Sequence, residues 1–168
     1  MIGAVLLFVG CSDTSEDPKP QSTPILPTIQ APVTVSTLRG NAAGVNAPFD
    51  TGVSKNTGME VSIVSVEDIN SRYGPVTVFT FQLTNVGEKV FDGYNWPTPT
   101  IVYGAAGSPA EHTVSLTEQY GAGVQGAVPP GSRQTVKHAY KVPKAQLNPA
   151  VVSAGSVIWQ GDFSTFQR

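Results

Sequence analysis

Two histidines are the residues best suited to acid–base or metal chemistry in this sequence. His138 lies in the run Gln134–Val142, whose alternation places it on the apolar side of a strand together with Tyr140. His112 follows Glu111, and neighbours along a strand point to opposite faces. Polar side chains on a buried face are hydrogen-bonded in most proteins. We therefore predict a packed, structural His138 and no metal site, because zinc needs three or four converging ligands.

The remaining polar residues match no catalytic motif. The sequence has no Gly-x-Ser-x-Gly elbow and no Ser-x-x-Lys pair. The glycine-rich run Gly121–Gly126 lacks the Lys-Ser/Thr of a phosphate cradle, and Asp92 and Asn95 supply too few oxygens for calcium. We expect the carboxylates to be solubilising charges at turns and strand ends, and the chain to be a non-enzymatic protein without cofactors. These carboxylates are Asp50, Glu60, Glu67, Asp68, Glu88, Asp92, Glu111, Glu118 and Asp162.

The strongest binding signal is aromatic. Phe91, Tyr94 and Trp96 lie in a short segment rich in turn residues, followed by Pro97 and Pro99. Tyrosine and tryptophan on loops are common anchors of protein interfaces. Two interpretations follow: these three residues form a partner-binding patch, or Trp96 plugs one end of the core.

The only cysteine, Cys11, follows an apolar run at Ile2–Val9. Eight helical residues rise about 12 Å, whereas a bilayer core of about 30 Å needs about 20 residues. The run is too short to span a membrane but suits the apolar part of a secretory signal. Since no Lys or Arg precedes it, we expect the natural start codon to lie upstream of Met1.

The segment Phe8-Val9-Gly10-Cys11-Ser12 resembles the lipobox of bacterial lipoproteins. This resemblance implies that residues 1–10 are a signal peptide, that the chain is cut before Cys11, and that its thiol receives a diacylglyceryl group. A further acyl chain is often added to the new amine in that family. Two or more acyl chains anchor a protein stably. We therefore expect lipidation at Cys11 and a position on the cell membrane, facing the extracellular side or the periplasm.

Residues 11–39 read as a tether. From Ser12 to Leu38 the chain has nine Ser or Thr residues and five prolines, at positions 18, 20, 24, 27 and 32. Such a composition buries too little apolar surface to offset the entropy of ordering. We expect a disordered tether that reaches on the order of 80 Å when extended.

The composition of the chain limits the class of the remaining domain, residues 40–168. The protein has 168 residues, with 17 Gly, 14 Pro and only 13% charged residues, which disfavours a helical bundle. A net charge of −2 gives no strong field that would attract nucleic acid or anionic lipid headgroups. We predict an all-β domain, an antiparallel immunoglobulin-like β-sandwich of about seven strands.

Short apolar runs separated by Gly, Pro and Asn supply these strands. In Val76–Val86, Phe79, Phe81 and Leu83 alternate with polar residues, as in a half-buried strand. In Glu60–Ile69, alternation places Val61 and Ile63 on one face and would extend that face to Ser65. Further strands are expected at Thr100–Tyr103, His112–Leu116, Gln134–Val142 and Ser156–Gln160, with a helical turn at Lys144–Leu147.

The run VTVFTFQLTNVGEKVF (Val76–Phe91) resembles the hairpin of small immunoglobulin-like bacterial lipoproteins of unknown function. The second half resembles the mycobacterial secreted immunoprotective extracellular antigen family. The matching residues there are GAVPPG (Gly126–Gly131), TVKHAYKV (Thr135–Val142) and VIWQ (Val157–Gln160). The resemblance covers roughly Val61–Gln160 and implies a sandwich fold without an established catalytic activity.

Together these observations favour a non-catalytic, lipid-anchored lipoprotein of the cell envelope that presents one binding domain. Its expected partner is an envelope protein, a glycan or a host-surface component. Two alternatives stay open: a carrier of a small apolar ligand or lipid between the sheets, and an uncharacterised envelope enzyme. A core filled by Phe79, Phe81, Leu83 and Trp159 would leave a carried ligand little room.

Overall fold

The structure is a computed structural model that describes residues 44–168. These residues lie within the range 40–168 that the sequence predicts for the folded domain. The predicted signal peptide 1–10, the lipidation site Cys11 and the tether 11–39 lie outside the described residues. Within residues 44–168, no helix has the length and apolar character needed to cross a membrane.

Residues 44–168 form an all-β fold with twelve strands and two single-turn 3-10 helices. Seven strands have three or more residues: β2 (Gly52–Ser54), β3 (Met59–Ser71), β4 (Gly74–Asn85), β6 (Thr100–Tyr103), β10 (Arg133–Tyr140), β11 (Ala150–Ala154) and β12 (Val157–Gly161). Five have two residues: β1 (Val45–Asn46), β5 (Phe91–Asp92), β7 (Ser108–Pro109), β8 (His112–Thr113) and β9 (Ala127–Val128). The helices are η1 (Gly93–Asn95) and η2 (Lys144–Gln146), the latter within the predicted helical turn.

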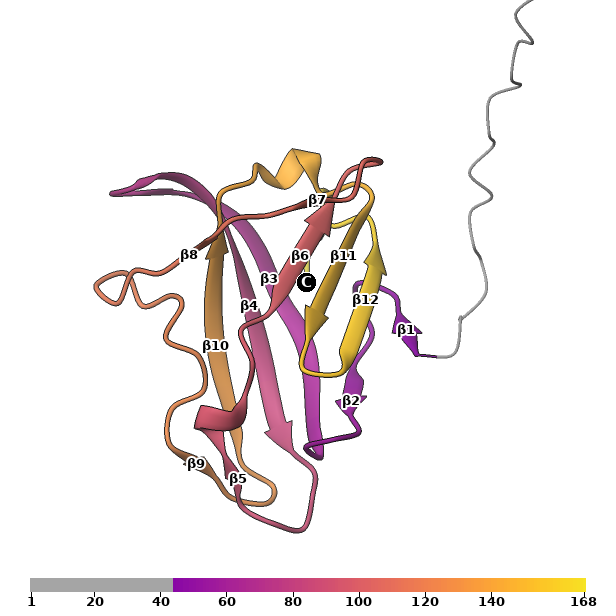
Figure 1. Ribbon diagram of the computed structural model, residues 1–168, viewed down its shortest axis with the longest axis vertical. Coiled ribbons are helices and arrows are strands. Elements are labelled where there is room, and N and C mark those ends of the chain that lie inside the picture. Colours follow the sequence, from indigo (N-terminus) through magenta and orange to yellow (C-terminus); the bar gives the residue numbers. More distant parts are fainter. Residues whose placement is uncertain (1–43) are drawn as a thin grey trace, which may run out of the picture. The chain divides into compact units, whose positions relative to one another are not determined.

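Two five-stranded sheets pack against each other as a β-sandwich (Figure 1). One has the strand order β1-β12-β11-β6-β7 and the other β2-β3-β4-β10-β8. Neighbouring strands are antiparallel, except that β1 runs parallel to β12. Strands β5 and β9 form a small third sheet near one end of the sandwich (Figure 1). The prediction of an antiparallel all-β domain is confirmed at this level.

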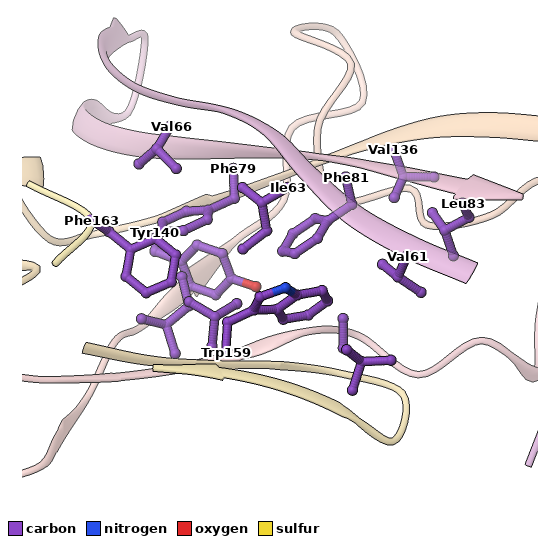
Figure 2. Close-up of a cluster of buried hydrophobic side chains, with 14 of the residues drawn as sticks. Val61, Ile63, Val66, Phe79, Phe81, Leu83, Val136, Tyr140, Trp159 and Phe163 are labelled. Atoms are coloured by element: carbon purple, nitrogen blue, oxygen red, sulfur yellow. The ribbon is translucent and has the colours of Figure 1, made fainter. Parts of the chain in front are cut away.

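Large apolar side chains fill the space between the two sheets (Figure 2). Phe79, Phe81 and Leu83 point inward from β4 and are fully buried, as the alternation predicts. The prediction of a half-buried strand is wrong over Val76–Thr80, because Val76, Val78 and Thr80 on the other face are buried too. Trp159 of β12 faces them, and its ring centroid lies 6.4 Å from that of Phe81. The indole Nε1 of Trp159 donates to the carbonyl of Asp50 at 2.9 Å, so this buried polar group is satisfied.

A register shift between Ile63 and Ser65 corrects the predicted faces of β3. Val61 and Ile63 point inward as predicted, but the next inward residue is Val66 rather than Ser65. The extra residue of a β-bulge reverses the alternation beyond it. The hydroxyl of Ser65 donates instead to the side chain of Thr80 at 2.9 Å.

One strand of the core has no counterpart among the predicted strands, and one predicted strand is shorter than expected. The strand without a counterpart is β11, which pairs with both β12 and β6 inside one sheet. The strand predicted at His112–Leu116 ends at Thr113, because Ser115 bridges to Tyr120 and turns the chain. This turn places Tyr120 on the outer face of the sheet to which β8 belongs, where it is buried against Val76, Val78 and Ala139.

Candidate functional site

The aromatic segment predicted to bind a partner divides into packed and exposed side chains. Trp96 belongs to the buried core cluster. Phe91 is half-buried and packs edge-on against Trp96, with ring centroids 6.2 Å apart. Tyr94 is 82% exposed. The structure therefore brings Phe91 and Trp96 together and leaves Tyr94 as the aromatic side chain of this segment that faces solvent.

The turn that carries Trp96 is fixed by local hydrogen bonds and by a glycine. Asp92 caps η1, since its Oδ1 accepts from the amide of Tyr94 at 3.1 Å. Gly155, in the β11–β12 turn at φ 62°, leaves room for the indole, because a Cβ there would lie 2.8 Å from Cη2 of Trp96. These contacts favour the interpretation that Trp96 plugs one end of the core.

The two histidines are neighbours in space. Nε2 of His112 and Nδ1 of His138 lie 3.0 Å apart, at hydrogen-bonding distance. Pairing of β8 with β10 places His112 opposite Tyr140, and residues opposite each other in a sheet share a face. His138 is thus the packed, hydrogen-bonded residue that the sequence predicts. Its hydrogen-bond partner His112 was not predictable from local sequence, because β8 and β10 are far apart along the chain.

Burial holds both imidazoles in the neutral form. The pKa of His138 is lowered to about 4, mainly by loss of solvation and further by the neighbouring His112. Burial also lowers the pKa of His112. The other ring nitrogen of His138, Nε2, is buried without a hydrogen-bond partner among the described residues. Within residues 44–168, no three His, Cys, Asp or Glu side chains converge to hold a metal ion.

A groove lies beside the projecting tip of the β3–β4 hairpin, and we call it the hairpin groove. Its volume is about 510 Å³. It is lined by Asp68, Ile69, Asn70, Tyr73, Pro75, Val76, Lys141, Val142 and Pro143. Tyr73, in the two-residue turn of the hairpin, is 62% exposed. The groove thus combines apolar walls with an aromatic ring, an amide and charged groups.

Hydrogen bonds from the β8–β9 loop hold the hairpin tip. Oε2 of Glu118 accepts from the hydroxyls of Ser71 at 2.8 Å and Tyr120 at 2.6 Å. Its Oε1 accepts from the amide of Arg72 at 3.2 Å. These hydrogen bonds lower the pKa of Glu118 to about 2, and the bond from Tyr120 contributes most. The expectation that Glu118 is only a solubilising charge is therefore wrong, because its carboxylate holds the hairpin tip.

The other wall of the hairpin groove is fixed through Asp68. Its Oδ1 accepts from the hydroxyl of Thr77 at 2.6 Å and from the amide of Lys144 at 2.9 Å. This links β3 to the segment after β10. Oδ2 of Asp68 and the side-chain amide of Asn70 form no hydrogen bond with the described part of the chain. Both residues lie on the same side of β3, since they are two positions apart.

A second hollow adjoins the hairpin groove, and we call it the histidine hollow. Its volume is about 500 Å³, and it is lined by Tyr73, Glu111, His112, Thr113, Val114 and Lys141. Tyr73 and Lys141 line both spaces, so the two meet there. Nζ of Lys141 and Oε1 of Glu111 form an exposed ion pair at 2.5 Å. Exposed ion pairs contribute about 0–1 kcal/mol to stability, so this pair holds the two side chains only weakly.

Comparisons with known proteins give no family. No family model matches the chain, and no curated protein matches it significantly. A solved structure, described as a conserved hypothetical protein from Bacillus anthracis, is similar over 70% of this chain and 94% of its own. The two share 11% sequence identity, with a TM-score of 0.48.

Proposed function

We propose that this protein is a non-catalytic, lipid-anchored lipoprotein of the cell envelope whose β-sandwich acts as a binding module. The anchor rests on the apolar run Ile2–Val9 and on Cys11, which lie in the order that lipidation requires. Residues 11–39 would hold the domain away from the membrane on a Pro/Ser/Thr-rich tether. The partner would be an envelope protein, a glycan or a host-surface component.

We further propose that the sandwich is immunoglobulin-like. Seven strands of three or more residues are divided between the two sheets. The chain crosses from one sheet to the other four times, between β1 and β2, between β4 and β6, between β7 and β8, and between β10 and β11. Such crossings are typical of Greek-key sandwiches.

The observation that carries the binding function is the hairpin groove. It is open, its volume falls within the range of about 300–1,000 Å³ for small-molecule sites, and it holds polar atoms not used by the described residues. The space between the sheets is occupied by aromatic and aliphatic side chains. This distribution favours binding at the surface over carriage of a ligand in the core.

Labelling and crosslinking in intact cells test the proposal. The native protein should incorporate an alkyne fatty acid, and Cys11→Ser should lose the label. Crosslinking followed by purification through a C-terminal tag should capture a specific partner with the native protein, and Tyr73→Ala should capture less of it. Labelling of Cys11→Ser at the native level would refute the anchor. Equal capture of every component by native protein and by Tyr73→Ala would refute the groove as the binding surface.

A further inference from the structure

We propose that the hairpin groove and the histidine hollow together bind an uncharged oligosaccharide. This inference rests on the proposed binding function and names the class of partner. The observations that carry it are an exposed aromatic ring between two hollows, free hydrogen-bonding groups, and the charge and dimensions of the surface.

The ring of Tyr73 lies where the two hollows meet. It lines both, and it is 62% exposed. Its backbone is held, because its amide donates to Oγ of Ser71 at 3.1 Å and the same Oγ is bonded to Glu118. The side chain of a tyrosine offers a flat apolar face and a polar hydroxyl. A sugar ring presents the matching surface, with C–H groups on its face and hydroxyls at its edge.

The polar groups of the hairpin groove suit hydroxyl ligands. Oδ2 of Asp68 accepts no hydrogen bond from residues 44–168, and the side-chain amide of Asn70 can supply both a donor and an acceptor. Since Oδ1 of Asp68 already accepts from Thr77 and from the amide of Lys144, the carboxylate is oriented before a ligand arrives. A sugar hydroxyl both donates and accepts, so one saccharide unit would satisfy both residues.

The charge of the surface selects against acidic ligands. The two hollows are lined by two carboxylates, Asp68 and Glu111, and one ammonium, Lys141, for a net charge of −1. Lys141 is engaged by Glu111. His112 is neutral at pH 7, because burial lowers its pKa. Phosphate, sulfate or uronate groups would therefore meet repulsion, whereas a neutral glycan would not.

The dimensions favour a chain of sugars over a single unit. Spaces of about 510 and 500 Å³ meet at Tyr73 and Lys141, so a ligand that stacks on the tyrosine extends into both. We place the sugar that bonds Asp68 and Asn70 in the hairpin groove and its neighbour in the histidine hollow.

Calorimetric titration of the full-length protein tests this inference. The protein should be held in a polyoxyethylene detergent, because maltoside detergents carry a sugar headgroup. The probes are maltotetraose, mannotetraose and N-acetylchitotetraose, with tetragalacturonate as the acidic comparison. We expect at least one neutral tetramer to bind with a Kd below about 1 mM and tetragalacturonate to bind more weakly.

Three variants locate the binding. Tyr73→Ala should raise the Kd of the neutral tetramer at least about tenfold. Asn70→Ala should raise it about two- to tenfold, which is the loss expected for one hydrogen bond. Tyr94→Ala, which removes an even more exposed tyrosine in another segment, should leave the Kd unchanged. Unchanged melting temperatures of Tyr73→Ala and Asn70→Ala would confirm that the fold is intact.

The inference is overturned if no neutral tetramer binds below about 1 mM, if tetragalacturonate binds more tightly, or if Tyr73→Ala binds like the native protein. These outcomes differ from failure of the proposed function. If no sugar binds while Tyr73→Ala loses a crosslinked protein partner in cells, the groove is a protein-binding surface and only the glycan assignment falls.

Discussion

The two most exposed tyrosines lie in regions built in opposite ways. Tyr94 is 82% exposed. The aromatic residues beside it, Phe91 and Trp96, pack edge-on against each other and against the core. Tyr73 is 62% exposed, and no aromatic residue lies next to it in the sequence. Its groove is formed by the β3–β4 hairpin and by residues 141–143, about 70 positions further along. Aromatic residues that are close together in this sequence therefore form a packed turn. The open groove is formed instead by segments that are distant in the sequence.

The largest expected effect is the loss of stability in Trp96→Ala, which tests whether the aromatic turn is packed into the core. Removal of a buried tryptophan costs about 3–5 kcal/mol, and the lost indole would leave a cavity between Phe91 and Gly155. Urea unfolding should show a lower midpoint with little change in slope. Trp96→Phe should recover much of the loss. A native-like midpoint for Trp96→Ala would mean that the indole is an accessible binding group and not a plug.

The next largest effect is the pH dependence of the histidine pair. The pKa of His138 is about 4 in the folded protein and near 6.5 in an unfolded chain, so the unfolded chain binds more protons between these values. Stability should therefore fall as pH drops from about 6.5 to about 4, by on the order of 3 kcal/mol. The lowered pKa of His112 acts in the same direction.

Urea unfolding at several pH values measures this dependence. In His138→Leu, a variant of similar volume that does not titrate, the slope between about pH 6.5 and pH 5 should be reduced. The range from about pH 6.5 to pH 5 lies above the pH at which ordinary carboxylates titrate. Equal slopes in native protein and His138→Leu would contradict the assignment to the buried pair.

A smaller, local effect is expected at the hairpin tip. Glu118→Ala removes the acceptor for the amide of Arg72 and for the hydroxyls of Ser71 and Tyr120. The amides of Arg72 and Tyr73 should exchange faster with deuterium, while amides in the centre of β4 keep native rates. Glu118→Gln should retain part of the protection. If Glu118→Ala leaves exchange at the tip unchanged, the hairpin holds its shape without the loop.

What the sequence predicts and what it misses have distinct physical causes. The alternation of Phe79, Phe81 and Leu83 shows which side of β4 faces the space between the sheets, because one register of a regular strand determines every face. The same rule fails in β3, where the bulge after Ile63 turns Val66 inward. Periodicity carries no signal for an inserted residue.

The candidate site was less predictable than the core. His138 could be placed on an apolar face from its own strand, but its contact with His112 depends on the pairing of β8 with β10. The role of Glu118 likewise depends on how a loop folds over the β3–β4 tip. Each is a long-range contact, and a single sequence contains only local patterns and composition.

The smallest expected effect is the change in stability when either exposed tyrosine is replaced by alanine. Tyr73→Ala and Tyr94→Ala should each change the free energy of unfolding by no more than about 0.5 kcal/mol, because both side chains lie at the surface. Their stability therefore does not distinguish them, and any difference in partner capture between the two variants reports on binding alone. Urea midpoints measured side by side test this equality. A clear loss of stability in Tyr73→Ala would mean that its ring supports the hairpin tip, and its effect on binding would then have to be judged against a variant that restores the tip, such as Tyr73→Phe.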